Sequence, residues 1–385
     1  MTRRLLFLPA ALLFGVLVAL ALGEVVIRAF RLEGDQFFEP NAWVGWVHRP
    51  GVHGTYVSDQ AKNGAVQINR RGLLGPERPY DKPAGVHRVL LLGDSYTESM
   101  QVPYAQTWGA LLEKSLGAGW EVINGGVAGY GTDNSLLELK REYAKYRPDV
   151  VFLLFFTGND VSDNDFELYG PDRGSRPKPW YSLDSTGGLV LHDSPMPLPR
   201  SARARLKSAL RTRSHLYRFV KDRLTMVRTA RGYKKGSKSG VPRPWYVYSK
   251  APAPDFDRAW RTTAALLHAL RAETDSTGAF LAAGTLPTDW RIEPDQRRQV
   301  LSAYPAMADT SQWDFALADR KAAAIFAAEG IPSVDLTPSL EDARRAANVP
   351  LYGDHLTAAG HRVVAERLAQ FFRDVVIPRV TAPPQ

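Results

Sequence analysis

Hydrophobic residues are distributed along this chain in two different patterns. Near the N-terminus, Leu5–Gly23 is an apolar run of 19 residues without a charge, close to the length that crosses a bilayer. Beyond residue 85, short apolar runs alternate with stretches whose apolar residues recur every three or four positions, which indicates buried strands followed by helices. The predicted strands are Arg88–Leu92, Trp120–Ile123, Val150–Phe156, Ala279–Ala283 and Pro332–Leu336.

The stretches between these strands predict helices. Strand and helix in alternation are typical of a parallel sheet covered on both faces. The expected fold class is therefore α/β, a three-layer α/β/α sandwich with a central parallel sheet. The predicted helices are Gln106–Leu116, Asn134–Tyr146, Phe256–Thr274, Asp314–Glu329 and Ala358–Val376, the last with Thr357 as its N-cap.

The same pattern divides the chain into three parts. Residues 1–32 are a predicted membrane anchor, and residues 33–85 an irregular lead-in with a strand-like piece at Ala65–Asn69. The main domain covers 86–380. Its alternation is interrupted over 161–255, where we expect an insertion made of a hairpin and a basic amphipathic helix.

The N-terminal run is interpreted as an uncleaved signal anchor. Arg3 and Arg4 precede it, as in sequences directed to a membrane. The small-residue cleavage pattern is Ala19-Leu20-Ala21, and apolar character resumes beyond it at Val25–Ile27, which disfavours a cleaved signal peptide. Either interpretation places the remainder of the chain outside the cytoplasm.

Positive charge is concentrated in one segment. The net charge is +9, yet residues 200–243 hold 15 Lys or Arg against the single acid Asp222, so the rest is mildly acidic. Three interpretations stay open: a helix docked on the domain with a solvated basic face, contact with anionic lipid headgroups, or contact with an acidic glycan. Export disfavours nucleic acid as a partner. The apolar residues at helical spacing are Leu206, Leu210, Leu216, Phe219, Val220, Leu224 and Val227.

The candidate catalytic residues lie at the carboxyl ends of the predicted strands. Asp94 and Ser95 follow the first strand, a glycine-rich stretch follows the second and Asn159 follows the third. A further loop, Tyr352–His355, precedes the last helix. Carboxyl ends of parallel strands are where open α/β sheets bind ligands. A hydroxyl, an imidazole, carboxylates and an amide together suit acyl transfer through a serine nucleophile. The absence of cysteine excludes thiolate metal sites and a cysteine nucleophile.

Four motifs in these positions resemble the blocks of the SGNH (GDSL-type) hydrolase superfamily, in the family's order. They are Gly93-Asp94-Ser95-Tyr96-Thr97-Glu98, Asn124 through Gly129, Gly158-Asn159-Asp160 and Asp354-His355-Leu356-Thr357. The resemblance runs from about Val86 to Phe372, apart from the insertion. The lead-in and anchor resemble those of membrane-tethered bacterial members thought to act on acyl groups of envelope carbohydrate or lipid.

The resemblance implies a role for each matching residue. Ser95 would be the nucleophile and His355 its general base. The oxyanion would be bound by the Ser95 and Gly129 backbone N–H groups and the Asn159 side-chain amide. No cofactor or metal is implied.

The third triad member departs from the family pattern. Most members have an aspartate two or three residues before the histidine, whereas Asp354 is the immediate neighbour of His355. Adjacent side chains in extended backbone point to opposite faces, so this pairing requires a turn, for which Gly353 is suited. Asp354 is the first candidate. Asp335 is the fallback, and a serine–histidine pair oriented by backbone is a third arrangement.

The expected function is that of a serine-dependent esterase or O-acyltransferase, located in a bacterial periplasm or at the cell surface. Its substrate would be an ester-linked acyl group, such as acetyl, on envelope polysaccharide or lipid. One alternative is an inactive binding or assembly protein with the same fold. Another is a lipid esterase or thioesterase, which predicts a preference for longer acyl chains.

The remaining polar residues are expected to have structural roles. His361 is expected at the surface of the last helix, and His48 has no partner in the sequence pattern. Asp160, Asp163 and Asp165 lack the glycine and distal glutamate of a calcium loop and predict a solvated turn.

Overall fold

The centre of the fold is a five-stranded parallel sheet with the order β11-β10-β7-β5-β6. It is seen in a computed structural model that describes residues 2–30, 32–58, 61–169, 177–194, 202–224, 240–251 and 253–381. The expected α/β/α class and the parallel sheet are confirmed. The strands are β5 (His87–Leu92), β6 (Trp120–Asn124), β7 (Val150–Phe156), β10 (Phe280–Leu286) and β11 (Ser333–Asp335).

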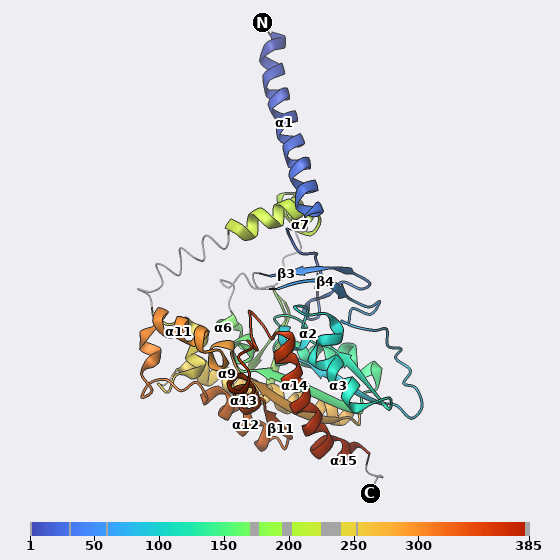
Figure 1. Cartoon of the computed structure of the whole chain (residues 1–385), viewed down its shortest axis with the longest axis vertical. Helices are drawn as coiled ribbons and strands as arrows, with labels where there is room; N and C mark the ends of the chain where they lie inside the picture. Colours follow the sequence, from blue (N-terminus) through green and yellow to red (C-terminus); the bar gives the residue numbers. More distant parts are fainter. Residues whose placement is uncertain are drawn as a thin grey trace.

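Helices cover both faces of this sheet (Figure 1). On one face α4 (Thr132–Arg141), α9 (Pro254–Ser276) and α12 (Leu317–Ala328) pack against alternate strand residues. On the other face α3 (Trp108–Leu116) and α14 (Ala358–Phe371) pack against the intervening ones. Both faces of each central strand are thus buried, which explains the continuous apolar runs in the sequence.

Several short elements fall outside the predicted pattern. The predicted strands and long helices are present with shifted ends, and Thr357 is the N-cap of α14, accepting from Gly360 N–H. The short helices outside that pattern are α2 (Ser95–Glu98), α5 (Asp160–Asp163), α6 (Phe166–Tyr169), α10 (Asp289–Ile292), α11 (Pro294–Ala303), α13 (Thr337–Ala346), α15 (Ile377–Val380), η1 (Tyr104–Gln106), η4 (Arg243–Tyr248) and η5 (Pro305–Ala308). The 3-10 helix η2 (Tyr143–Tyr146) and the π-helix η6 (Phe372–Val376) form the ends of two predicted helices.

The lead-in contains two antiparallel hairpins where one strand was predicted. The first joins β1 (Phe38–Asn41) to β2 (Gly45–His48), and the second joins β3 (His53–Val57) to β4 (Lys62–Gln67). Trp46 of β2 lies in a small core with Tyr130 of the main domain. The lead-in therefore packs directly on the glycine-rich loop of the sheet.

The insertion has an antiparallel hairpin at the predicted position, β8 (Trp180–Leu183) with β9 (Leu189–His192). Its basic part is described over 202–224 and 240–243, and Val227 lies outside the described residues. Two helices occupy the first stretch, α7 (Ala202–Arg213) and residues 215–224. Figure 1 shows α7 lying across the end of the long N-terminal helix α1 (Thr2–Ala29).

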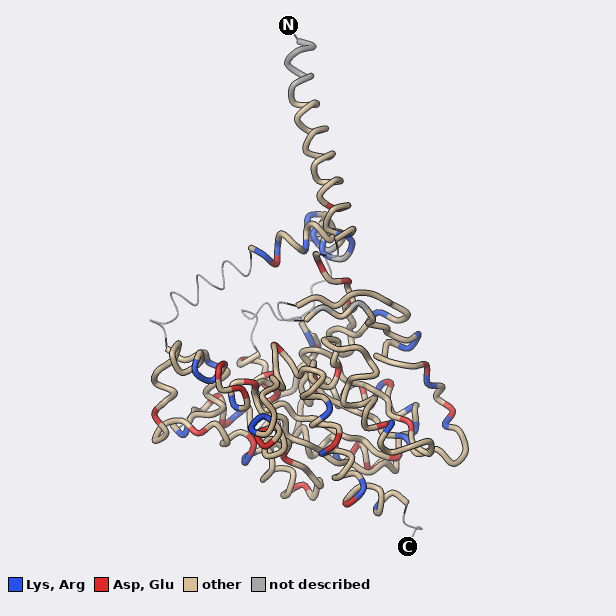
Figure 2. The backbone as a smooth tube through the Cα atoms, in the orientation of Figure 1, with Lys and Arg blue, Asp and Glu red and all other residues tan. Residues whose placement is uncertain are grey.

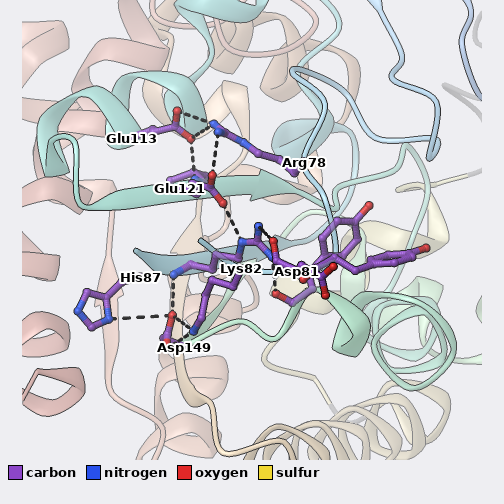
Figure 3. A network of polar contacts seen from close by, with 11 residues as sticks. Arg78, Asp81, Lys82, His87, Glu113, Glu121 and Asp149 are labelled. Atoms are coloured by element: carbon purple, nitrogen blue, oxygen red, sulfur yellow. Dashed lines mark hydrogen bonds and ion pairs between the residues drawn. The ribbon is translucent and has the colours of Figure 1, made fainter. Parts of the chain in front are cut away.

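Charged residues close the edge of the sheet at the amino ends of the strands (Figure 3). The Arg88 side chain is fully buried, and its Nε donates to Glu121 Oε2 at 2.7 Å. Arg78 bonds Glu113, and Lys82 bonds Asp149. Each of these three cations has a carboxylate partner, so the charges of this network are paired at the edge opposite the candidate chemistry.

Candidate active site

Ser95 is presented by a sharp turn after the central strand β5. Gly93 has φ +145°, and a Cβ there would lie 2.4 Å from Thr97 Oγ1, so the turn requires glycine. Asp94 then caps α2, accepting from Tyr96 N–H at 2.9 Å, as expected for a residue that shapes the turn. Ser95 is consequently the first residue of α2, with a partly exposed side chain.

His355 meets Ser95 from the loop before α14. Its Nε2 lies 2.8 Å from Ser95 Oγ, which is hydrogen-bonding distance although 260 positions separate the two residues. The Tyr96 ring packs on the imidazole with centroids 4.7 Å apart. The two residues that the motifs single out as nucleophile and base are therefore in direct contact.

Two residues that the sequence did not single out hold the histidine loop. Glu293, between α10 and α11, accepts from the backbone N–H groups of Leu351 and Tyr352 at 2.7 and 3.1 Å. Gln296 Nε2 donates to the carbonyl of Gly353 at 3.0 Å. Only their contacts with a distant loop reveal this role, because a Glu and a Gln in a polar stretch of sequence are ordinarily surface residues.

Asp354 is near His355 but does not hydrogen-bond it. A turn closed by Gly353 N–H and the His355 carbonyl brings the two side chains to one side, with Asp354 Oδ2 3.9 Å from His355 Nδ1. That separation is an ion-pair contact, and Nδ1 is buried without a hydrogen-bond partner. The fallback Asp335 accepts from Thr337 N–H and Thr285 Oγ1 instead. The Asp354 side chain is thus the carboxylate that faces Nδ1.

Three carboxyl groups share the electrostatic surroundings of His355. Burial raises the pKa of Asp94 to about 6 and also raises the pKa of Asp289, while the charge of His355 opposes both shifts. The pKa of Asp354 is lowered because contacts with His355 and Ser58 outweigh its partial burial. Acidic groups on several sides suit an imidazole that becomes positively charged when it accepts the serine proton.

Gly129 lies in the loop that follows β6, the neighbour of β5 in the sheet. Its φ is +80°, and an added Cβ would lie 3.3 Å from the Trp46 ring. The same loop bonds the turn of Ser95, since Val127 N–H donates to the Gly93 carbonyl at 3.1 Å. The glycine loop and the serine turn are therefore one connected unit.

A buried pair that joins the lead-in to α2 stabilises this unit. Glu98 Oε1 accepts from Ala128 N–H at 2.9 Å and lies 2.7 Å from His48 Nε2. Both side chains are 1% exposed. Trp46 adds a third contact, its Nε1–H donating to the Ala128 carbonyl at 3.0 Å. His48, for which the sequence pattern gave no partner, thus acts on the backbone beside Gly129 through Glu98.

Asn159 follows β7, the strand on the other side of β5. Its Nδ2 donates to Asp94 Oδ2 at a long 3.4 Å, and its Oδ1 is buried without a partner. Gly129 and Asn159 therefore flank Ser95 from the two neighbouring strands. That the Gly129 backbone N–H and the Asn159 amide donate hydrogen bonds to an oxyanion stays a prediction.

The prediction of a solvated turn at Asp160, Asp163 and Asp165 is wrong. These side chains are 2%, 6% and 4% exposed. Asp160 accepts from Phe156 N–H, and burial with the nearby charge of Asp94 raises its pKa well above the usual range. Asp165 is paired with Arg258. The segment starts α5 against the sheet edge, so tertiary packing removes it from water.

The prediction of a surface position for His361 is also wrong. His361 is 1% exposed, and its Nδ1 accepts from Trp108 N–H at 3.2 Å, which joins α14 to α3. Burial lowers its pKa to about 3, so the ring is neutral near pH 7. Among the described residues, no group of three or more His, Asp and Glu side chains is placed to hold a metal ion.

Comparison with known proteins gave matches among solved structures. TesA is 14% identical over 75% of this chain and 100% of its own, with a TM-score of 0.37. A lipolytic G-D-S-L protein from Veillonella parvula is 16% identical, covering 75% and 100% of the two chains, with a TM-score of 0.38. Axe2, an acetylxylan esterase from Geobacillus stearothermophilus, is 14% identical over 75% and 94%, with a TM-score of 0.37. At these identities the likeness concerns the fold alone.

Two other comparisons found nothing. A scan of protein-family models gave no match, and neither did a search of curated proteins.

Proposed function

We propose that this protein is an SGNH-type serine esterase that works through an acyl-enzyme on Ser95. The observation that carries the proposal is the 2.8 Å contact between Ser95 Oγ and His355 Nε2 at the carboxyl edge of the sheet. A serine hydroxyl is a weak nucleophile unless a base takes its proton. Here an imidazole is in contact with it, and carboxyl groups surround that imidazole.

The proposed reaction proceeds in two steps. Ser95 Oγ attacks the ester carbonyl as its proton passes to His355 Nε2, and the C–O bond to the alcohol breaks as His355 returns that proton to the leaving oxygen. Water then attacks the acyl-enzyme by the reverse proton path. Backbone N–H groups of Ser95 and Gly129 and the Asn159 amide would bind the oxyanion of both tetrahedral intermediates. A sugar hydroxyl in place of water would make the same site an O-acyltransferase.

We further propose a small acyl group, such as acetyl, on envelope polysaccharide or lipid as the substrate. The support is the resemblance to membrane-tethered members and the apolar helix α1, whose segment Pro9–Ala29 contains an 18-residue window with a mean hydropathy of 2.6, of which 6% is buried. With α1 as an anchor, the catalytic domain would lie outside the cytoplasm. The insertion would then sit between the site and the membrane.

The test uses the full chain in detergent with p-nitrophenyl acetate, butyrate and octanoate. We expect Ser95→Ala and His355→Ala each to lower kcat/KM by roughly 10³-fold or more, because each removes a member of one catalytic unit. Matched controls are Ser115→Ala and His268→Ala, an exposed serine and an exposed histidine on α3 and α9.

Each outcome identifies one hypothesis. Loss in both site variants but neither control supports the esterase. Equal background rates for all five proteins refute hydrolysis. An acetylated saccharide and an acceptor sugar are then added: acetyl transfer by the wild type that Ser95→Ala lacks identifies an O-acyltransferase. Absence of transfer as well favours the inactive binding protein. A preference for octanoate over acetate favours the lipid esterase or thioesterase.

A further inference from the structure

A groove lies where the N-terminal helix meets the basic insertion. It has a volume of about 1080 Å³, and its apolar lining includes Leu20 and Ala21 of α1, Leu210 of α7, and Leu216, Val220 and Leu224 of residues 215–224. We call it the interfacial groove. It is separate from the Ser95 site, and the proposed reaction uses none of its residues.

Hydrogen bonds and close packing join the three helices that line the groove, which are α1, α7 and residues 215–224. The Glu24 carboxylate accepts from the backbone N–H groups of His215 and Leu216, both at 2.9 Å, and thereby caps residues 215–224. Arg28 Nη2 donates to the Arg213 carbonyl at the end of α7 at 2.8 Å. Gly23 also permits close packing, because a Cβ there would lie 3.1 Å from Leu216. One turn of α1 thus holds the ends of both basic-segment helices.

The position of the groove is set by α1. The apolar run of α1 ends at Gly23, and Glu24 is the first charged residue after it. Nineteen residues of helix rise about 28 Å, close to the thickness of a bilayer's hydrocarbon core. Leu20 and Ala21 then lie in the last turn inside the hydrocarbon. A groove lined by these residues and by the two short helices must straddle the bilayer surface.

The positive charge and the exposed apolar side chains of α7 and residues 215–224 fit a position at the bilayer surface. Residues 202–224 hold eight Lys or Arg against Asp222 alone, and Figure 2 shows this positive charge gathered at the foot of α1. Leucine side chains stay in contact with solvent among these charges: Leu206 is 61% exposed and Leu224 53%. Apolar residues flanked by cations are typical of helices that lie in the headgroup region.

We propose that the interfacial groove binds an anionic phospholipid of the bilayer that α1 crosses. Acyl chains would fill the apolar lining, and the phosphate would meet cations of the two helices, including Arg213 and Lys221 at the rim. Anionic lipids attract basic segments near the surface and so fit this charge better than zwitterionic ones. The bound lipid would fix the height of the catalytic domain above the membrane.

The absence of cysteine permits a direct test on the full chain. Leu210→Cys and Leu224→Cys would each carry a polarity-sensitive fluorophore, with Val349→Cys, 49% exposed in the main domain, as the control. Each protein is reconstituted in phosphatidylcholine bilayers with or without phosphatidylglycerol. Quenching by brominated acyl chains reports immersion. We expect a blue shift and quenching at positions 210 and 224, greater with phosphatidylglycerol, and none at 349.

Charge variants test the headgroup assignment. Arg213→Gln and Lys221→Gln each remove a cation that lines the interfacial groove. We expect the affinity for phosphatidylglycerol to fall about fivefold for each cation removed, whereas Lys114→Gln, on exposed α3 surface, changes nothing. Water-exposed labels at 210 and 224 in both bilayers would overturn the proposal. Equal immersion with and without phosphatidylglycerol would overturn its anionic part. Esterase assays on the same samples report independently on the proposed function.

Discussion

His355 Nδ1 is the atom on which the residue-scale mechanism depends. In serine hydrolases with a complete triad, a carboxylate hydrogen-bonded to this nitrogen fixes the tautomer and stabilises the imidazolium. Here Asp354 Oδ2 lies 3.9 Å away, and both side chains are partly exposed, at 29% for Asp354 and 22% for His355. The interaction is therefore one of charge with little directional bonding.

Asp354→Asn is predicted to lower kcat/KM by about tenfold. A partly exposed ion pair contributes on the order of 1 kcal/mol, whereas removing a hydrogen-bonded triad carboxylate costs roughly 10⁴-fold. Steady-state hydrolysis of p-nitrophenyl acetate measures the difference, with Asp335→Asn as the control expected to keep full activity. A loss near 10⁴-fold would mean that Asp354 closes on Nδ1 during catalysis and would contradict the ion-pair interpretation.

Side-chain burial limits what can be inferred about single residues. The sequence predicts a surface position for His361, in the first turn of the last helix, and for Asp163, in a turn rich in aspartate. Their burial is produced by α3 packing over His361 and by Lys178, whose Nζ donates to the Asp163 carbonyl and to Asp133. These partners lie far away in the sequence or in the insertion, and no local pattern identifies them.

At the scale of elements, the first hairpin of the lead-in is part of the site's support. β2 contributes Trp46 and His48, and both reach the loop of Gly129, directly or through Glu98. An oxyanion donor is effective only if its N–H is fixed before the charge develops. A segment that the sequence described as an irregular lead-in thus stabilises the backbone on which the proposed chemistry depends.

Glu98→Ala is predicted to reduce both stability and turnover. Two buried donors, Ala128 N–H and His48 Nε2–H, would lose their acceptor, at about 2–4 kcal/mol in total. We expect kcat to fall about ten- to hundredfold with KM little changed, because in the proposed reaction the Gly129 N–H would bind the developing oxyanion. Denaturant unfolding and p-nitrophenyl acetate kinetics measure the two effects.

Two matched variants separate positioning from general destabilisation. Glu98→Gln keeps an acceptor oxygen and should restore most of kcat. Glu121→Gln removes charge from the Arg88 pair at the opposite edge of the sheet, so it should lower stability without changing kcat. If Glu121→Gln lowers kcat as much as Glu98→Ala does, the loss reflects weakened folding and Glu98 has no positioning role.

The whole molecule consists of a layered domain and a projecting helix joined by the basic insertion (Figure 1). Most of the α1 segment Pro9–Ala29 is exposed, because only 6% of its most apolar 18-residue window is buried. An apolar helix that no core covers is unstable in water and favours a membrane environment. The contacts of Glu24 and Arg28 with the insertion make the end of α1 part of the folded structure.

Retention of α1 is predicted for the mature protein. Cleavage after Ala21 would remove the helix that carries the groove, whereas an uncleaved chain would stay with membranes in alkaline carbonate and be released only by detergent. Intact-mass measurement of the membrane fraction gives the N-terminus directly. A mature chain that begins at Leu22 and is found in the soluble fraction would contradict the anchor and, with it, the interfacial groove.

The sequence by itself determined the α/β class, the order of the strands along the chain and the residues of the candidate site. Those features follow from local information: apolar runs fix buried strands, and polar motifs stand at their ends. Tertiary structure decided which groups meet. The Ser95–His355 contact spans 260 positions, and the His48–Glu98 pair joins separate parts of the chain. Such contacts depend on how helices and hairpins pack in space, which periodicity along the chain does not encode.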